Sequence, residues 1–446
     1  MSRPDEGWLG GAALLPFPVP SAVPLAGYAA RTGPAVGVLD ELAIATLLLT
    51  HGADRLAIIA ADVVGADADL ADEVAQAAGL ARSELALCAT HTHSGPAGIT
   101  ARLHPADPDL LDRRLRTRFV ATAAAALALA RERLEPVELI LGSARSGDVA
   151  ANRNDPMGPY DDRLTVLAAR RPDGSFQAVL VHFACHPTIL GAENRLVSAD
   201  FPGVLRREIA AALAGDGDAP VVLFVNGAAG DVSTRFTRRG QDVAEVERIG
   251  KRLTTAAGNA LAAANPLRGP LRHGSATVRL SPRRDSASRA EKAVSEPSVP
   301  ELGATDLSPA RQRIAVTRAQ GEAMLAALTA IPHELAAIPR TLRIDAWTLG
   351  DLALVAVPAE LFVSLGREIE KAFPGKTLIL GYANGYSGYL ADRTAHGSGT
   401  YEALASPFGP EAGERVAATA ARLVVRLRSG PPGPGVGALH GVLDRS

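Results

Sequence analysis

The sequence predicts a mixed α/β fold, in which β-sheets are flanked by helices in a single large domain with a helical insertion. Three observations predict it. Short apolar runs typical of buried strands alternate with longer amphipathic or Ala-rich segments typical of helices. The chain has 446 residues and is 47% hydrophobic, which is enough for a sizeable core. Side chains with metal-ligand chemistry follow several of the apolar runs, where open α/β sheets place their sites.

The first half of the chain shows the alternation clearly. Residues 1–35 are rich in Pro and Gly and are expected to be irregular. The expected strands that follow are Leu42–Leu49, Arg55–Asp62, Leu85–Thr90, Val137–Leu141, Leu164–Ala168, Ala178–Ala184 and Pro220–Val225. The expected helices are Leu70–Leu80, Arg114–Leu134, Gly203–Ala214 and Asp242–Ala264.

The second half contains a segment of different character. Residues 282–340 are densely charged and weakly periodic apart from a helical stretch, Ser308–Leu328, and are expected to form an insertion or lid. Beyond it we expect a hairpin of Arg343–Leu349 and Leu352–Val357, a strand Lys376–Leu380 and a helix Ala412–Arg428. The domain is therefore expected to span residues 1–430, with residues 431–446 as a flexible tail.

Composition excludes several classes of protein. The net charge is −2 and no basic stripe stands out, which argues against nucleic-acid binding. Two cysteines, Cys88 and Cys185, cannot form a disulfide framework. No apolar run is long enough for a transmembrane helix, and the acidic, proline-containing N-terminus is unlike a signal peptide, so we expect a cytoplasmic protein. The sequence does not indicate an oligomeric state.

A His-x-His motif, His91 and His93, follows the expected strand Leu85–Thr90 and precedes a Ser-Gly-Pro break. Residues i and i+2 of a strand share a face, so both imidazoles are expected to point the same way. Such a pair can bind a metal with both rings, or bind with one ring and keep the other as a base. The simpler interpretation is a pair of polar residues at a solvated strand end.

Candidate ligands recur beyond other strands. His91, His186, Glu360 and the tyrosines Tyr386 and Tyr389 each follow an expected apolar strand. Two imidazoles, a carboxylate and a phenol oxygen form a donor set that favours zinc. Both cysteines lie an odd number of residues from a candidate histidine and are expected to face away from the metal.

These stretches resemble the neutral/alkaline ceramidases. The matching segments are Pro24–Tyr28, Ala89–Pro96, Asn152–Arg153, Phe183–His186, Ser198–Asp200, Asn226–Ser233, Pro358–Glu360 and Asn384–Tyr401. They occur in order along nearly the whole chain. The His-Thr-His-Ser-Gly-Pro block is the most specific of them.

The resemblance implies one zinc ion bound by His91, His186, Glu360 and Tyr389. The separation of the tyrosine pair, Tyr389 and Tyr401, selects Tyr389 over Tyr386 as the ligand. It also implies that His93, Arg153 and Tyr401 act on the reacting carbonyl without binding zinc. The implied activity is a zinc amidohydrolase that cleaves the amide bond of an N-acyl compound such as ceramide. Its partner would be a small-molecule or lipid-like N-acyl substrate.

The sequence also departs from the ceramidase pattern. The expected β-sandwich domain is missing after the tyrosine loop, Gly227 replaces a serine, and Ala391–Thr400 lacks an acid-rich run. A hydrolase of the same fold that acts on a non-lipid amide, lactam or ester is therefore an alternative, as is a non-catalytic metal-binding protein.

Two aspartates and one loop have two interpretations each. Asp62 and Asp200 are candidates to orient the imidazoles of the metal site, or to form helix caps and turns. The loop Asn226–Asp231 either holds a polar group of the substrate or makes a tight turn.

Overall fold

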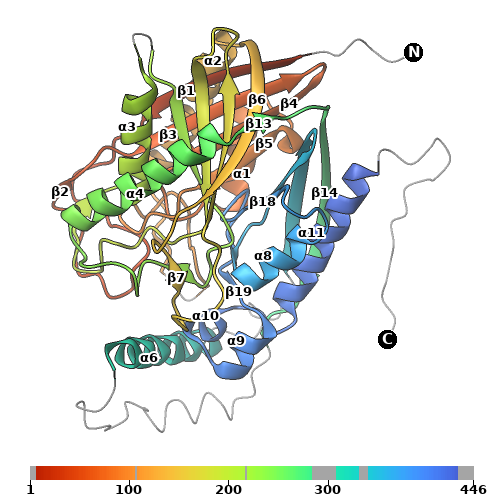
Figure 1. The fold of residues 1–446 in the computed structure, drawn as a ribbon. Coiled ribbons are helices and arrows are strands. Elements are labelled where there is room, and N and C mark those ends of the chain that lie inside the picture. The colour runs from red at the N-terminus through yellow and green to blue at the C-terminus, as the bar shows by residue number, and fades with distance from the viewer. Residues whose placement is uncertain (1–6, 106–107, 216–217, 284–307, 331–339, 430–446) are drawn as a thin grey trace.

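The computed structural model describes residues 7–105, 108–215, 218–283, 308–330 and 340–429 (Figure 1). The predicted mixed α/β fold is confirmed, with a large mixed sheet flanked by helices. No helix among these residues is both long enough and apolar enough to cross a bilayer. The predicted tail, residues 431–446, lies outside the described residues, as do large parts of the expected insertion.

The large sheet has the strand order β11-β9-β8-β6-β1-β3-β4-β5, with β13 paired to β6. Its strands are β1 Trp8–Pro16, β3 Ala43–His51, β4 Asp54–Ala61, β5 Leu85–Ala89, β6 Glu135–Arg145, β8 Arg163–Arg170, β9 Phe176–Phe183, β11 Val221–Asn226 and β13 Asn265–Pro266. The pairs β4–β5 and β9–β11 are parallel and the other pairs are antiparallel. The carboxyl ends of β5 and β9 lead into the candidate site.

Helices cover the outer face of this sheet, and its inner face packs in a separate hydrophobic core. Helices α1 (Ala68–Ala77) and α2 (Arg113–Glu132) pack on β1, β3, β4 and β5, whereas α3 (Phe201–Leu213) and α4 (Val243–Ala262) pack on β6, β8, β9 and β11. Inward-facing side chains from both halves meet in a common core that also includes Trp347 and Leu354 of the smaller sheet. The sheets therefore form one body.

The smaller sheet has the order β14-β15-β16-β18 and lies beside the large one. Its strands are β14 Leu271–Leu280, β15 Arg340–Leu349, β16 Leu352–Ala356 and β18 Thr377–Leu380. Helices α8 (Val363–Glu370) and α11 (Ala412–Arg428) cover its outer face (Figure 1). Strands β16 and β18 are parallel, and the chain leaving β16 reaches Glu360.

Short elements join the loops beyond the strand ends. They are β2 Gly37–Val38 with β10 Leu196–Val197, β7 Ala151–Asn152 with β12 Val232–Ser233, β17 Glu360–Leu361 with β19 Tyr389–Leu390, the 3₁₀ turn η1 Arg82–Glu84, and the helices α9 Arg393–Ser398 and α10 Tyr401–Ala405. The pairing of β17 with β19 sets Glu360 directly beside Tyr389 in the ladder. These small ladders bring distant parts of the chain to one place.

The described part of the insertion is helix α6, Pro309–Thr329, which lies against α10 (Figure 1). The contact is close at Gly321, where an added Cβ would lie 2.9 Å from the Tyr401 Cα. Only glycine allows the two backbones to approach this far. The insertion helix is therefore packed on the element that begins with Tyr401.

Most expected elements are present, and the long strands that were not predicted are β1 and β14. The prediction that residues 1–35 are irregular is wrong for Trp8–Pro16, because β1 pairs with β3 along its whole length and joins the two halves of the large sheet. Its apolar residues are interrupted by Gly10 and Gly11, which obscured the pattern. An added Cβ on Gly11 would lie 2.0 Å from the Ala130 carbonyl oxygen, so the glycine permits close packing of α2 on the strand.

A buried ion pair connects α3 to the end of β4. Asp62 accepts two hydrogen bonds from Arg206, at 2.7 and 2.5 Å, and a third from the Ala43 amide at 2.8 Å. The Asp62 side chain is fully buried. We expect Arg206→Met to destabilise the protein by about 3–5 kcal/mol because it leaves an unpaired buried carboxylate.

Denaturant unfolding measures this effect. The matched control is Arg207→Gln, because the exposed Arg207 pairs only with surface acids and its removal should cost within about 0.5 kcal/mol. Equal unfolding midpoints for the two variants would contradict the role given to the Asp62–Arg206 pair.

Candidate metal centre

His91 lies in a turn beyond β5 and not in the strand itself. Strand β5 ends at Ala89, and His91 has a φ of 69°, which a non-glycine residue seldom adopts. The His91 amide donates to the Val63 carbonyl at 3.0 Å and holds this conformation. The prediction that strand alternation points His91 and His93 the same way is therefore wrong in its geometry, although the two rings do meet.

His186 and Glu360 reach the same place from the other sheet edges. His186 follows β9, and its amide donates to the Val232 carbonyl at 3.0 Å. Glu360 begins β17, two residues before the N-cap of helix α8. The Glu360 amide donates to the Gly388 carbonyl at 3.0 Å. Each of the two residues is thus fixed by its own backbone.

Three hydrogen-bond acceptors converge in the buried interior. The Nδ1 atoms of His91 and His186 contact the carbonyls of Val64 (2.5 Å) and Val232 (3.1 Å). Because a carbonyl only accepts, both Nδ1 atoms carry the proton and both Nε2 atoms present lone pairs. Those Nε2 atoms lie 3.4 and 2.9 Å from the Glu360 Oε2. Acceptors this close repel one another unless a cation or a proton lies between them.

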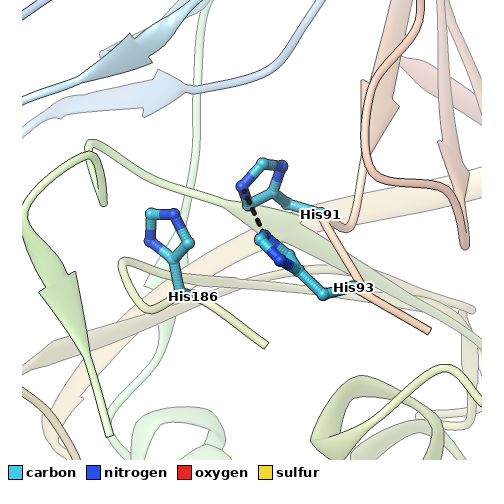
Figure 2. A group of neighbouring side chains, drawn as sticks. All are labelled: His91, His93 and His186. Atoms are coloured by element: carbon cyan, nitrogen blue, oxygen red, sulfur yellow. Dashed lines mark hydrogen bonds between the residues drawn. The ribbon is translucent and has the colours of Figure 1, made fainter. Parts of the chain in front are cut away.

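His93 completes the cluster. Figure 2 shows the rings of His91, His93 and His186 gathered together, with the Nε2 atoms of His91 and His93 at 3.2 Å. Ligand atoms bound tetrahedrally at about 2.1 Å lie about 3.4 Å apart, which is close to these separations. The three imidazoles alone, or His91 and His186 with Glu360, therefore fit a metal ion.

Burial and neighbouring charges set the protonation of the cluster. Burial lowers the pKa of His186 to about 3 and, with the other two imidazoles, lowers that of His93 well below 6.5. Burial alone would raise the pKa of Glu360, but the adjacent histidines more than offset this and hold it well below its usual value. At neutral pH the site thus presents His93 and His186 as neutral imidazoles beside an ionised carboxylate, which is the state in which these groups bind metal.

Arg153 lies beside this cluster and is held on three sides. Its Nη2 donates to the Gly230 carbonyl at 2.7 Å and to the Tyr389 hydroxyl at 3.0 Å, and its Nε lies 2.6 Å from the Glu402 carboxylate. Burial would lower the Arg153 pKa, but Tyr389 and Glu402 raise it well above its usual value. Arg153 is therefore a permanent buried cation with a fixed orientation.

Tyr386 and Tyr389 form hydrogen bonds with different charged groups of the site, Glu360 and Arg153. The Tyr386 hydroxyl donates to the Glu360 Oε1, whereas the Tyr389 hydroxyl is bonded to Arg153. Tyr401 begins α10, and its ring lies 5.8 Å from that of Tyr389. Burial raises the pKa of Tyr389 well above 10, and Arg153 opposes this shift. All the residues expected at the site are thus neighbours, and Tyr386 is the phenol in contact with Glu360.

Residues that the sequence reasoning did not select also line the site. The Tyr382 ring stacks on His91 at 3.9 Å, and its fully buried hydroxyl has no hydrogen-bond partner among the described residues. Glu402, which pairs with Arg153, follows Tyr401 directly. An acid beside a candidate site tyrosine was the available signal for Glu402. The sequence offered none for Tyr382.

The loop before β2 holds His93 from the opposite side. The Tyr28 ring packs 4.8 Å from the His93 ring, and Arg31 Nη2 donates to the His93 carbonyl at 2.7 Å. Gly27 has a φ of 96°, and an added Cβ would lie 2.5 Å from the imidazole. Part of the Pro24–Tyr28 motif thus serves to seat His93, whose Nδ1 has no partner among the described residues.

The remaining predicted residues have structural roles. Asp200 caps α3 and also accepts from the Leu190 amide, and Asp62 pairs with Arg206, so neither contacts an imidazole of the site. Both cysteines are buried in apolar cores, as predicted. Burial raises the pKa of Cys88 to about 12, so this thiol stays protonated.

The loop beyond β11 makes a tight turn that other segments hold in place. The side chain of Asn226 bonds the backbones of Cys185 and Thr90, and Asp231 accepts from Asn152 and from the Val363 amide. Both polar side chains of the loop are thus engaged with the protein itself.

The fold and the site define a class: a mixed α/β protein with a buried histidine cluster that is compatible with a metal ion, beside an ionised glutamate and a buried arginine. The chain belongs to the neutral/alkaline non-lysosomal ceramidase family, whose N-terminal sequence profile matches residues 19–247. The matched region contains His91, His93, Arg153 and His186.

Solved structures support the same fold. The crystal structure of neutral ceramidase from Pseudomonas aeruginosa superimposes with a TM-score of 0.75 at 20% identity, covering 96% of this chain and 76% of that chain. A structure described as a ceramidase complexed with C2 gives 0.75 at 19% identity with the same coverage. No curated protein matches the sequence.

Metal binding has a direct physical readout. Because an ion between the three acceptors binds the folded state and not the unfolded chain, we expect Zn²⁺ at a hundredfold excess over its Kd to stabilise the protein by about 2.7 kcal/mol. Thermal unfolding with and without the ion measures this shift. His91→Ala should abolish it. His51→Ala, at the end of β3, should keep it, and an equal shift in both variants would refute the site.

Proposed function

We propose that this protein is a zinc-dependent hydrolase that cleaves the amide bond of an N-acyl compound, with ceramide-like lipids as the first candidates. The observation that supports it most is the convergence of the His91 and His186 Nε2 atoms on the Glu360 carboxylate, with His93 and Arg153 beside them. Membership of the ceramidase family supports the choice of an amide over other bonds.

Zinc suits this donor set. His91, His186 and Glu360 would hold the ion, and Tyr389 is the proposed fourth protein ligand. When bound, zinc supplies a water that is nucleophilic at neutral pH and polarises the carbonyl to be attacked. The backbone carbonyls of Val64 and Val232 fix the tautomer and the orientation of both imidazoles, which is how hydrogen bonds outside the ligand sphere usually support a metal site.

His93 is the proposed general base. Burial lowers its pKa well below 6.5, so the ring is neutral at pH 7 and able to accept a proton. Arg31 and the Tyr28 ring fix its position beside His91. After taking a proton from the attacking water, His93 would deliver it to the nitrogen of the leaving amine. That transfer is required because an amine leaves far more readily than its anion.

Arg153 and Tyr401 are proposed to stabilise the oxygen that gains negative charge when the carbonyl becomes tetrahedral. Arg153 stays charged at any working pH because Tyr389 and Glu402 outweigh its burial. A cation held by fixed partners needs little reorganisation during the reaction, which is the main source of electrostatic catalysis. The Tyr401 hydroxyl would donate a hydrogen bond to the same oxygen.

His93 discriminates an enzyme from a metal-binding scaffold. We expect His93→Ala to retain the metal and to lose about 10²–10⁴-fold in turnover, since it removes the general base alone. The measurements are metal content and hydrolysis of N-acylsphingosine and of short N-acyl amides. Hydrolysis of the short amides alone would assign the protein to the non-lipid alternative. Undiminished turnover in His93→Ala would exclude the proposed base.

The two tyrosines provide a second test. If Tyr389 is the ligand, Tyr389→Phe should lower zinc affinity by more than about tenfold, and Tyr386→Phe, which removes only a hydrogen bond to Glu360, by about tenfold or less. Competition with a chromophoric chelator measures both affinities. A larger loss in Tyr386→Phe would transfer the ligand role to Tyr386.

A further inference from the structure

Three arginines besides Arg153 are anchored around the candidate metal centre. Arg235 donates to the carbonyl of Arg153 at 3.1 Å, and Arg313 of α6 donates to the carbonyl of Arg235 at 2.9 Å. Arg238 donates to the carbonyl of Thr188, two residues beyond His186. Each guanidinium is thus tied to the backbone of a site residue or of the next arginine. We call Arg235, Arg238 and Arg313 the arginine cluster.

Within the described ranges the cluster forms no ion pair with a carboxylate, although the charges of Glu402 and Asp200 act on Arg235 and Arg238 from farther away. Two partly buried arginines elsewhere in the chain do form ion pairs: Arg116 pairs with Asp67 and Glu73, and Arg163 pairs with Asp161 and Glu370. A guanidinium has five N–H donors. In the described structure each arginine of the cluster uses one, towards a carbonyl.

Arg31 differs from the arginine cluster because its hydrogen bonds hold three backbone segments in place. It donates through all three of its nitrogens, to the carbonyls of Ala26, His93 and Asn194. Its hydrogen-bonding capacity is largely used by the protein, which leaves Arg235, Arg238 and Arg313 as the groups able to bind something else.

The positive charges of Arg153 and of the arginine cluster repel one another. Burial, then the nearby Arg153, lowers the pKa of Arg235 to about 10. Burial also lowers the pKa of Arg238, and Arg313 contributes to that shift. The two side chains are partly buried, so water compensates them less than it would at an open surface. An anion bound among these guanidiniums would relieve both the desolvation and the mutual repulsion.

We propose that the arginine cluster binds an anionic group of the substrate, a carboxylate, sulfonate or phosphate, while the metal centre acts on its amide bond. This inference rests on the proposed function and deepens it. Ceramide is uncharged and offers these guanidiniums no oxyanion. The preferred substrate is therefore an N-acyl compound with a negative charge near the amide. Planar guanidiniums suit such oxyanions because they donate paired hydrogen bonds.

Binding measurements can test the proposed anion site without requiring hydrolysis. The probes are N-dodecanoylglycine against N-dodecanoylethanolamine, and the hexylamine monoamide of adipic acid against N-hexylhexanamide. In these pairs the anion lies on the amine side and on the acyl side, respectively. Calorimetry on the metal-loaded His93→Ala protein avoids hydrolysis. We expect at least one anionic probe to bind about tenfold more tightly than its neutral partner, as for a hydrogen bond to a charged group.

Substitutions assign the preference to the cluster. Arg235→Gln and Arg238→Gln, each in the same background, should reduce the anionic-to-neutral affinity ratio severalfold. The control Arg279→Gln, an exposed arginine on β14, should leave it unchanged. The inference is overturned if neither pair shows a preference, or if the ratio is the same in the cluster variants and the control.

Hydrolysis separates this inference from the proposed function. Wild-type protein should cleave the preferred anionic probe with a higher kcat/KM than its neutral partner. If neither is cleaved although the anionic probe binds better, the proposed function fails and the anion site stands. If both are cleaved at equal kcat/KM and bound equally, the function stands and the anion site fails.

Discussion

The repulsion between three acceptors held face to face is the constraint on which this structure depends. The Nε2 lone pairs of His91 and His186 each face the carboxylate of Glu360, at 3.4 and 2.9 Å, away from solvent. If the two imidazoles and the carboxylate were separated, water would hydrate each of them. The backbone prevents separation, because carbonyls fix both rings and the β17–β19 ladder fixes the glutamate. A cation bound between them would satisfy all three groups together and offset the cost of burying them.

A second layer of charge surrounds this centre. Arg153 is clamped by Glu402, and Glu402 belongs to the short helix α10 on which α6 packs. Helix α6 therefore supports the buried arginine indirectly, through backbone contact at Gly321. Positive side chains dominate the ring around the site and are fastened mainly to carbonyls. That arrangement fixes guanidiniums in place without neutralising them, which distinguishes it from the paired arginines on the outer helices.

The sequence predicted those parts of the structure that depend on local pattern. Apolar runs located most strands, and the His-x-His motif located His91 because a polar pair after a buried strand is unusual. Strand β1 was missed because glycines required for close packing interrupt its pattern. The contact of Tyr386 with Glu360 depends on how a loop folds back, which spacing does not encode. The arginine cluster escaped composition analysis because Arg313 lies 78 positions beyond Arg235 and joins Arg235 and Arg238 only in the folded chain.

The Asn384 side chain has a consequence for the order of events during synthesis. Its amide bonds the backbone of β5 at Leu85 and Leu87, so the edge of an early strand is closed by a residue nearly 300 positions later in the chain. Glu360 and the tyrosine loop both lie in the last fifth of the chain and are synthesised long after His91 and His186. Closure of this edge, and with it assembly of a site that includes Glu360, therefore waits until the last part of the chain has been synthesised.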